Sequence, residues 1–154
     1  MFCKTTEELI KKLNNQRSGK KVVFTNGCFD LLHVGHIRYL EEAKKCGDIL
    51  VVGINTDASV KKLKGENRPI QKEDERAEIL AALRAVDYTV LFAEETPLEL
   101  IKQVVPDVLV KGGDWPIAKI VGADFVLKNG GEVRSLNFVE GRSTTNILKK
   151  QSNL

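Results

Sequence analysis

The chain's two histidines, His33 and His36, stand three residues apart, and Gly35 lies between them. Residues three apart lie on one face of a helix, so both imidazoles can face the same volume if His33 lies near a helix start. A helix start offers free backbone N–H groups and the positive end of the helix dipole, and both favour phosphate. Gly35 has no side chain, so a ligand can approach the backbone closely there. This spacing therefore predicts that the two histidines bind phosphate groups.

The segment before the histidines predicts a strand that ends in a tight turn. Residues 21–25 are rich in β-branched and aromatic side chains, which favours a buried strand, and Asn26 and Gly27 bend the chain. Apolar positions then continue at helical spacing to about Lys45, and Gly47 ends that helix. Two unrelated core or surface histidines are the alternative. The place of both histidines directly behind a strand and a glycine turn argues against it.

Helical and strand patterns alternate along the rest of the chain. Thr5 begins a capping-box sequence that predicts a first helix over 5–17, and Thr96 followed by Pro97 predicts another helix start. Residues 58–71 predict a short helical turn and then a mobile loop. Further helices are expected over 72–85, with Ile79, Leu80 and Leu83 facing inward, over 117–128 and over 143–150. Further strands are expected over 48–54, 88–92, 108–111 and 132–136.

This alternation predicts βαβ units, and therefore a single α/β domain over 1–154 with a core over about 20–150. The expected architecture is a Rossmann-like, doubly wound parallel sheet of about five strands with helices on both faces. In such sheets ligands bind outside the carboxyl ends of the strands. Those ends fall at 26–30, 55–57, 111–115 and, before the last helix, 141–145, and each is polar, charged or rich in glycine.

Composition narrows the class of partner. The chain has 154 residues, of which 42% are hydrophobic and 29% charged, as in ordinary globular domains. A net charge of +3 is too mild to indicate a nucleic acid. Local groups of basic residues suit an anionic small molecule, although solvated surface charge explains any single one of them equally well. They are Lys61, Lys62, Lys64 and Arg68, and then Arg142, Lys149 and Lys150.

The three cysteines, Cys3, Cys28 and Cys46, lack the short paired spacing of a zinc site and predict free thiols in a reducing compartment. Cys28 follows the first strand, but no other feature supports a nucleophilic role for it. No apolar run approaches 18 residues, and the N-terminus has no signal-peptide pattern. We therefore expect a cytoplasmic protein that neither spans nor binds a membrane and has no metal site of its own.

Residues 26–36, which contain Phe29, Asp30 and both histidines, resemble the nucleotidyltransferase superfamily in its cytidylyltransferase-like branch. Residues 63–65, 68–69, 110–114 and 143–147 resemble the heptose 1-phosphate adenylyltransferases. These motifs follow the family's order and cover about residues 5–150. In many relatives the domain follows a sugar kinase domain. No kinase portion is present in this chain, so a stand-alone form is expected.

The resemblance implies transfer of AMP from ATP to a heptose 1-phosphate, which gives ADP-heptose and pyrophosphate. Such in-line chemistry needs alignment and neutralised charge rather than a protein nucleophile. Mg²⁺ is expected, carried largely by the triphosphate and water. A homodimer is also implied. Glycerol 3-phosphate with CTP, FMN with ATP, a guanylyl donor and a non-catalytic nucleotide-binding module remain alternatives, and the anomer of the sugar phosphate stays open.

The resemblance also implies roles for individual residues. His33 and His36 would bind the ATP phosphates and stabilise the charge that develops as pyrophosphate leaves. The backbone amides of Cys28 and Phe29 would hold phosphate, and Lys64 would grip it from a flexible loop, with Lys61 as the rival for that role. Arg142 would join the two histidines and Lys64 as a catalytic residue. The other implied nucleotide-binding residues are Asn26, Gly27, Gly35, Lys111, Asp114, Trp115, Ser143, Thr144 and Thr145.

Three residues are implied contacts of the sugar phosphate, and Lys61 is one of them. Asp30 would accept hydrogen bonds from the sugar hydroxyls, and Arg76 would lie near the site, although an ordinary surface pair explains Arg76 nearly as well. Two of the nucleotide residues also have structural alternatives. Ser143 could serve as a simple helix cap, and Trp115, the one tryptophan, could pack in the core.

Overall fold

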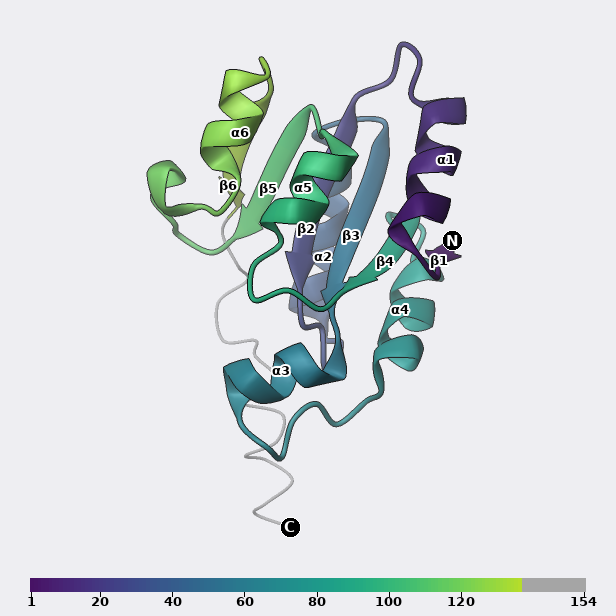
Figure 1. Ribbon diagram of the computed structural model, residues 1–154, viewed down its shortest axis with the longest axis vertical. Helices are drawn as coiled ribbons and strands as arrows, with labels where there is room; N and C mark the ends of the chain where they lie inside the picture. The colour runs from purple at the N-terminus through teal and green to yellow at the C-terminus, as the bar shows by residue number, and fades with distance from the viewer. Residues whose placement is uncertain (137–154) are drawn as a thin grey trace.

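A parallel sheet forms the centre of the computed structural model, which describes residues 1–136 (Figure 1). Within that part of the chain the sheet has six strands in the order β1-β4-β3-β2-β5-β6, and every neighbouring pair is parallel. This confirms the predicted doubly wound α/β fold. The strands are β1 (Phe2–Cys3), β2 (Val22–Gly27), β3 (Ile49–Asn55), β4 (Tyr88–Phe92), β5 (Val108–Gly112) and β6 (Glu132–Leu136).

The sheet has one strand more than the sequence predicts. The extra strand, β1, is two residues long and pairs with Thr89 and Val90 of β4. Two residues carry no alternating pattern, so β1 is defined only by its partner strand. The other five strands lie where they were predicted, to within one or two residues at their ends.

Helices cover both faces of the sheet (Figure 1). Residues of α1 (Thr6–Gln16), α5 (Leu98–Val104) and α6 (Ala123–Lys128) pack in one buried cluster with alternate residues of the strands. Residues of α2 (Val34–Lys44) and α4 (Glu73–Ala81) pack in a second cluster on the other face. Neighbouring strand residues enter opposite clusters, as the period of two in a strand requires. A short 3₁₀ helix, η1 (Ile117–Lys119), precedes α6.

Local signals explain several helix ends. Thr5 caps α1 as predicted, because its hydroxyl accepts a hydrogen bond from Glu8 N at 3.2 Å. Thr56 caps α3 (Asp57–Lys64) in the same way, so a full helix stands where only a helical turn was predicted. The predicted Thr96 cap is shifted, since α5 begins at Leu98 and Pro97 takes the cap position. Leu80 is buried as expected, whereas Ile79, also expected to face inward, is exposed.

The fold brings polar residues together at one end of the sheet. β2 lies between β3 and β5, and the three strands end at Gly27, Asn55 and Gly112. Helix α3 lies beyond the ends of β2 and β3 (Figure 1). Over residues 1–136, no helix is long and apolar enough to cross a membrane. The predicted helix over 143–150 lies outside the described residues.

Candidate active site

The turn after β2 has an unusual backbone. Phe29 has a φ of +46°, a left-handed conformation that is uncommon for a residue with a side chain. Its ring lies over Gly27, where an added Cβ would stand 2.9 Å from Phe29 Cε2. Gly27 is therefore required for the ring to lie there. The turn leads to His33, which takes the N-cap position of α2 without a side-chain capping bond.

The two histidines form a stacked pair at the start of α2. Their ring centroids lie 3.9 Å apart and their planes are inclined by 23°, so the two imidazoles lie side by side; of the two, only His36 lines the cavity between the turn and the strand ends. The edge of Phe29 meets His36 with a centroid distance of 5.3 Å. Gly35 lies buried in the first turn of the same helix. Phe29 therefore links the conformation of the turn to the position of the histidine pair.

His36 is kept neutral by its surroundings. Burial, followed by repulsion from His33 and Lys64, lowers the pKa of His36 from 6.5 to about 4. Its Nδ1 atom is buried and has no hydrogen-bond partner among residues 1–136. A negatively charged ligand beside this ring would counter both positive neighbours. The position of His36 therefore suits an anion.

A cavity of about 200 Å³, which we call the histidine cavity, opens between the turn and the ends of the strands. Its charged groups are Lys64 from α3 and Lys111 from β5, and burial lowers the pKa of Lys111. No carboxylate is among the described residues that line it. Cations, imidazole and backbone donors suit several phosphate groups together. The lining residues are Asn26, Gly27, Cys28, Phe29, His36, Tyr39, Lys64, Lys111 and Gly112.

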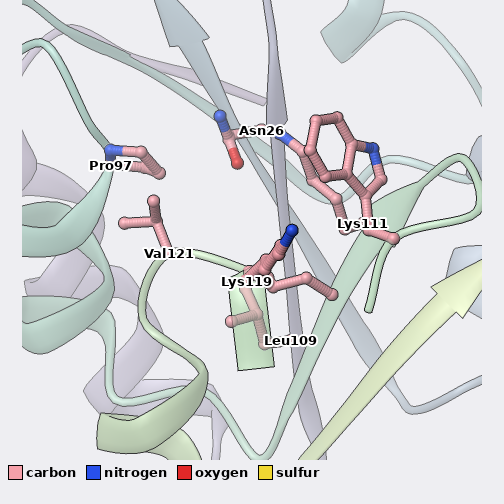
Figure 2. Close-up of a pocket in the computed structure, with 8 residues that line it drawn as sticks. Asn26, Pro97, Leu109, Lys111, Lys119 and Val121 are labelled. Atoms are coloured by element: carbon pink, nitrogen blue, oxygen red, sulfur yellow. The ribbon is translucent and has the colours of Figure 1, made fainter. Parts of the chain in front are cut away.

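A second cavity of about 210 Å³, the tryptophan cavity, shares Asn26 and Lys111 with the first. Figure 2 shows Asn26 between Lys111 on one side and Pro97 and Val121 on the other. This cavity is more apolar, and it suits a flat ring better than a phosphate group. The lining residues are Asn26, Pro97, Leu109, Lys111, Trp115, Lys119, Ile120 and Val121.

Trp115 lies on the wall of this cavity and not in the core. It is 49% exposed, and its backbone N–H donates to Ser135 Oγ at 3.1 Å. Core packing, the structural alternative for this residue, is therefore excluded. Its neighbour Asp114 is exposed and lines neither cavity. Lys119 and Val121, which the sequence did not single out, come from the segment around η1.

The hydroxyl of Tyr39 connects the two strands that carry the residues shared by both cavities. Its hydroxyl lies 2.6 Å from Thr25 Oγ1 and donates to Val110 O at 3.4 Å. Thr25 precedes Asn26 and Val110 precedes Lys111, so one hydroxyl joins the two strands just before the residues that the cavities share. Sequence reasoning missed Tyr39, because a tyrosine within an apolar helical stripe reads as ordinary core.

Asp30 is turned toward the chain and not toward a cavity. It is 1% exposed, its carboxylate accepts hydrogen bonds from Ile70 N at 2.7 Å and Gln71 N at 3.2 Å, and it forms an ion pair with Arg68. These contacts fasten the loop between α3 and α4 to the turn. The predicted contact with sugar hydroxyls has no counterpart in this arrangement.

Arg76 is likewise placed differently from expectation. Its side chain is 0% exposed, and four of its N–H groups are directed at protein acceptors. The acceptors are Gln71 O at 3.1 Å, Cys28 O at 2.5 Å, Asn55 O at 2.8 Å and Asp57 Oδ1 at 2.7 Å. A surface pair, the alternative for this residue, is excluded. The guanidinium has no exposed surface with which to contact a sugar phosphate.

The remaining predicted residues fall into three groups. Lys64 lines the histidine cavity, whereas the rival Lys61 is exposed and lines neither cavity. Arg142 and residues 143–145 lie outside the described residues. Over residues 1–136, no three His, Cys, Asp or Glu side chains gather in a group that could hold a metal ion.

Comparison with known proteins identifies relatives of this arrangement. A family model described as cytidylyltransferase-like matches residues 24–148. The chain is 62% identical over 132 residues to the Bifunctional protein HldE of Citrifermentans bemidjiense, a match that covers 86% of this chain and 27% of that protein. It is 57% identical over 151 residues to the Bifunctional protein HldE of Nitratiruptor sp., with 97% and 32% covered. The chain thus spans less than a third of the length of these relatives.

Solved structures agree on the fold. The chain superposes on the lipopolysaccharide core biosynthesis protein of Thermoplasma volcanium with a TM-score of 0.63 and 33% identity, covering 80% of this chain and all of the other. Pantothenate synthetase of Thermus thermophilus matches with a TM-score of 0.68 but only 17% identity, which is a likeness of fold alone.

Proposed function

Because the chain belongs to the cytidylyltransferase-like family, we propose that it transfers AMP from ATP to a heptose 1-phosphate, giving ADP-heptose and pyrophosphate. The observation that carries the proposal is a pair of neighbouring cavities that share Asn26 and Lys111, one suited to phosphate groups and one to a flat ring. The identity to HldE proteins and to a lipopolysaccharide core biosynthesis protein supports the choice of a heptose as acceptor.

In the proposed reaction, an oxygen of the sugar phosphate attacks the α-phosphorus of ATP. The bond from that phosphorus to the oxygen bridging the α and β phosphates breaks, and pyrophosphate leaves with the electron pair. The protein supplies no nucleophile. Its part is to hold two anions in line and to stabilise the charge that moves to the leaving group.

The histidine cavity offers the groups for that task. The amides of Cys28 and Phe29 and the side chains of His36 and Lys64 would donate to the phosphates, and His33 would act beside its stacked partner. An arriving phosphate raises the pKa of His36, so the ring becomes a cationic donor only when the substrate is bound. Arg142 and residues 143–145, by the resemblance, would contact the β and γ phosphates.

The tryptophan cavity would hold the nucleoside. In this arrangement Trp115 offers a ring face for stacking, and Asn26 and Lys119 offer hydrogen bonds to the base or ribose. Lys111, on the wall shared by both cavities, would lie beside the α-phosphate. The proposed role for Asp114 at the ribose requires its exposed side chain to turn toward the nucleotide.

Mg²⁺ would enter with ATP. The described residues do not gather three acidic, imidazole or thiol ligands, so they offer no protein-only site for the ion. Phosphate oxygens and water would supply its ligands, and the bound ion would neutralise phosphate charge. The homodimer and the cytoplasmic location stay predictions.

The test measures pyrophosphate release from each nucleoside triphosphate against a panel of acceptors. The panel contains both anomers of heptose 1-phosphate, glycerol 3-phosphate and FMN. Release with ATP and one heptose 1-phosphate alone is the expected result. Release only with CTP and glycerol 3-phosphate, or only with FMN, would show that the acceptor is not a heptose 1-phosphate. Nucleotide binding without release from any pair would favour a binding module.

A further inference from the structure

Arg76, in α4, carries a charged side chain that has no exposed surface. Charged residues are almost never fully buried unless they are paired. Its partners come from distant parts of the chain: the turn after β2, the end of β3, the start of α3 and the loop before α4. Such a set of partners holds segments in place relative to one another, and two of these segments form the histidine cavity.

One of these bonds orients a peptide group of the phosphate turn. In a trans peptide the carbonyl of one residue and the N–H of the next point in opposite directions. The carbonyl of Cys28 faces Arg76 Nη1 at 2.5 Å, so the N–H of Phe29 points away from Arg76. Both residues line the histidine cavity, and no described residue accepts a hydrogen bond from Phe29 N–H.

The same bond holds a strained backbone. Phe29 has a φ of +46°, and such a conformation persists only where surrounding contacts over-determine it. The ring of Phe29 contributes by packing on His36. The bond from Arg76 contributes from the backbone side. Without that bond, the peptide between Cys28 and Phe29 is free to rotate toward an unstrained conformation.

The other end of the guanidinium reaches the helix that carries Lys64. Arg76 Nη2 donates to Asn55 O at the end of β3 and pairs with Asp57 in the first turn of α3. Lys64, the last residue of that helix, lines the histidine cavity. One buried side chain therefore fixes the turn amides and the base of the lysine helix in a single network.

We propose that Arg76 is a positioning residue for polyphosphate binding: it touches no substrate, and its guanidinium aims the Phe29 amide and helix α3 at the histidine cavity. This deepens the proposed function and rests on it only in taking a polyphosphate as the ligand. The role differs from the direct sugar-phosphate contact that the sequence resemblance implied.

The test compares Arg76→Lys with Arg17→Lys. Lysine keeps the charge but loses the planar fork that reaches several acceptors at once. Arg17 is a matched control, because its guanidinium also donates to two backbone carbonyls, Val104 O at 3.2 Å and Val105 O at 2.8 Å, away from both cavities. Both variants lose such bonds, so both lower the melting temperature.

Two readouts separate the variants. The first is the affinity for inorganic tripolyphosphate by titration calorimetry, which Arg76→Lys weakens at least tenfold and Arg17→Lys by less than twofold. The second is the three-bond coupling between the amide and α protons of Phe29 in the ligand-free protein, which reports the φ angle of that residue; Arg76→Lys shifts this coupling away from the value of the left-handed conformation, and Arg17→Lys leaves it unchanged. If Arg76→Lys does not fold, Asp57→Asn removes the carboxylate partner alone and shifts both readouts in the same direction.

The outcomes distinguish this inference from the proposed function. A wild-type protein that does not bind tripolyphosphate would count against the proposed function, while the φ angle of Phe29 would still test the positioning role. An unchanged coupling at Phe29 and wild-type affinity in Arg76→Lys, with only a lower melting temperature, would show that Arg76 has a purely structural role.

Discussion

The imidazole of His36 stacks on that of His33, with 3.9 Å between their centroids. At this separation a charge on one ring opposes a charge on the other, so protonation of the pair is coupled. Lys64 adds a second positive neighbour, and burial removes water. His36 is therefore unprotonated in the free protein near neutral pH and ready to gain a proton beside an anion.

The free protein should lose stability in mild acid. The pKa of His36 is lowered to about 4 in the folded chain and is about 6.5 when unfolded, so the unfolded chain binds more protons between these values. The free energy of unfolding falls as the pH decreases from about 6.5 to about 4. Urea unfolding across this range measures the slope, and His36→Asn, which cannot titrate, should flatten it. An equal slope in the variant would mean that other groups cause the loss.

Binding of tripolyphosphate should take up protons near pH 6. The anion raises the pKa of His36 from its depressed value, so a ring that was neutral becomes protonated on binding. Titration calorimetry in two buffers of different ionisation enthalpy gives the number of protons. His36→Asn should reduce that number, and proton release on binding would contradict the assignment.

Lys64 and Lys61 give a matched pair on one helix. Both lysines are exposed, but only Lys64 lines the histidine cavity, while Lys61 lies one turn earlier and lines neither cavity. Lys64→Ala should weaken ATP binding by roughly tenfold or more, since a charge-assisted bond to phosphate contributes about 1.5–3 kcal/mol. Lys61→Ala should change it by less than twofold. Equilibrium dialysis with ATP measures both, and the reverse order would identify Lys61 as the phosphate ligand.

Gly27→Ala should disturb the histidine pair through Phe29. The added Cβ would stand 2.9 Å from the Phe29 ring, which itself contacts His36. Overpacking of this kind costs about 1–3 kcal/mol, and a displaced ring should also slow turnover. Thermal unfolding and initial rates measure the two effects. Phe29→Leu combined with Gly27→Ala provides the control, because the smaller side chain removes the clash and the losses should not add.

Tyr39→Phe should loosen the strands that carry Asn26 and Lys111. The variant deletes the hydroxyl that contacts Thr25 and Val110 and leaves the buried Thr25 hydroxyl without that partner, at a cost of about 1–2 kcal/mol. Chemical denaturation measures the loss. Tyr88→Phe is the control, since Tyr88 is also buried and its hydroxyl has no hydrogen bond to the described residues. Equal losses of unfolding free energy in both variants would show that the Tyr39 hydroxyl does not stabilise the two strands by bridging them.

The sequence predicts the parts of the fold that local pattern encodes. The run over residues 48–54 gives β3, whose seven residues are all buried, and Thr5 gives the start of α1. The histidine pair also follows from local spacing, because a strand, a glycine turn and a helix start are signals within a dozen residues. Elements that depend on partners far along the chain cannot be predicted from the local sequence, and the two-residue β1 is one of them.

The same limit explains the residues at the site. Arg76 resembles any helix arginine in the sequence, and only the fold brings the carbonyls of Cys28 and Asn55 to it. Asp30 follows the phosphate turn and looks available to a substrate. In the structure its oxygens are used by Ile70 and Gln71, forty residues away. The chemistry of a side chain can be read from its type, but its orientation depends on partners far along the chain.

The two cavities meet at Asn26 and Lys111, and this shared wall has a consequence for inhibitor design. An aromatic fragment in one cavity and a short polyphosphate mimic in the other would occupy the protein at the same time. A linker that passes over these two residues would make the second binding event intramolecular, so the joined compound gains affinity through effective concentration without a new contact. The length of that linker, varied one bond at a time, would measure the path between the two cavities in solution.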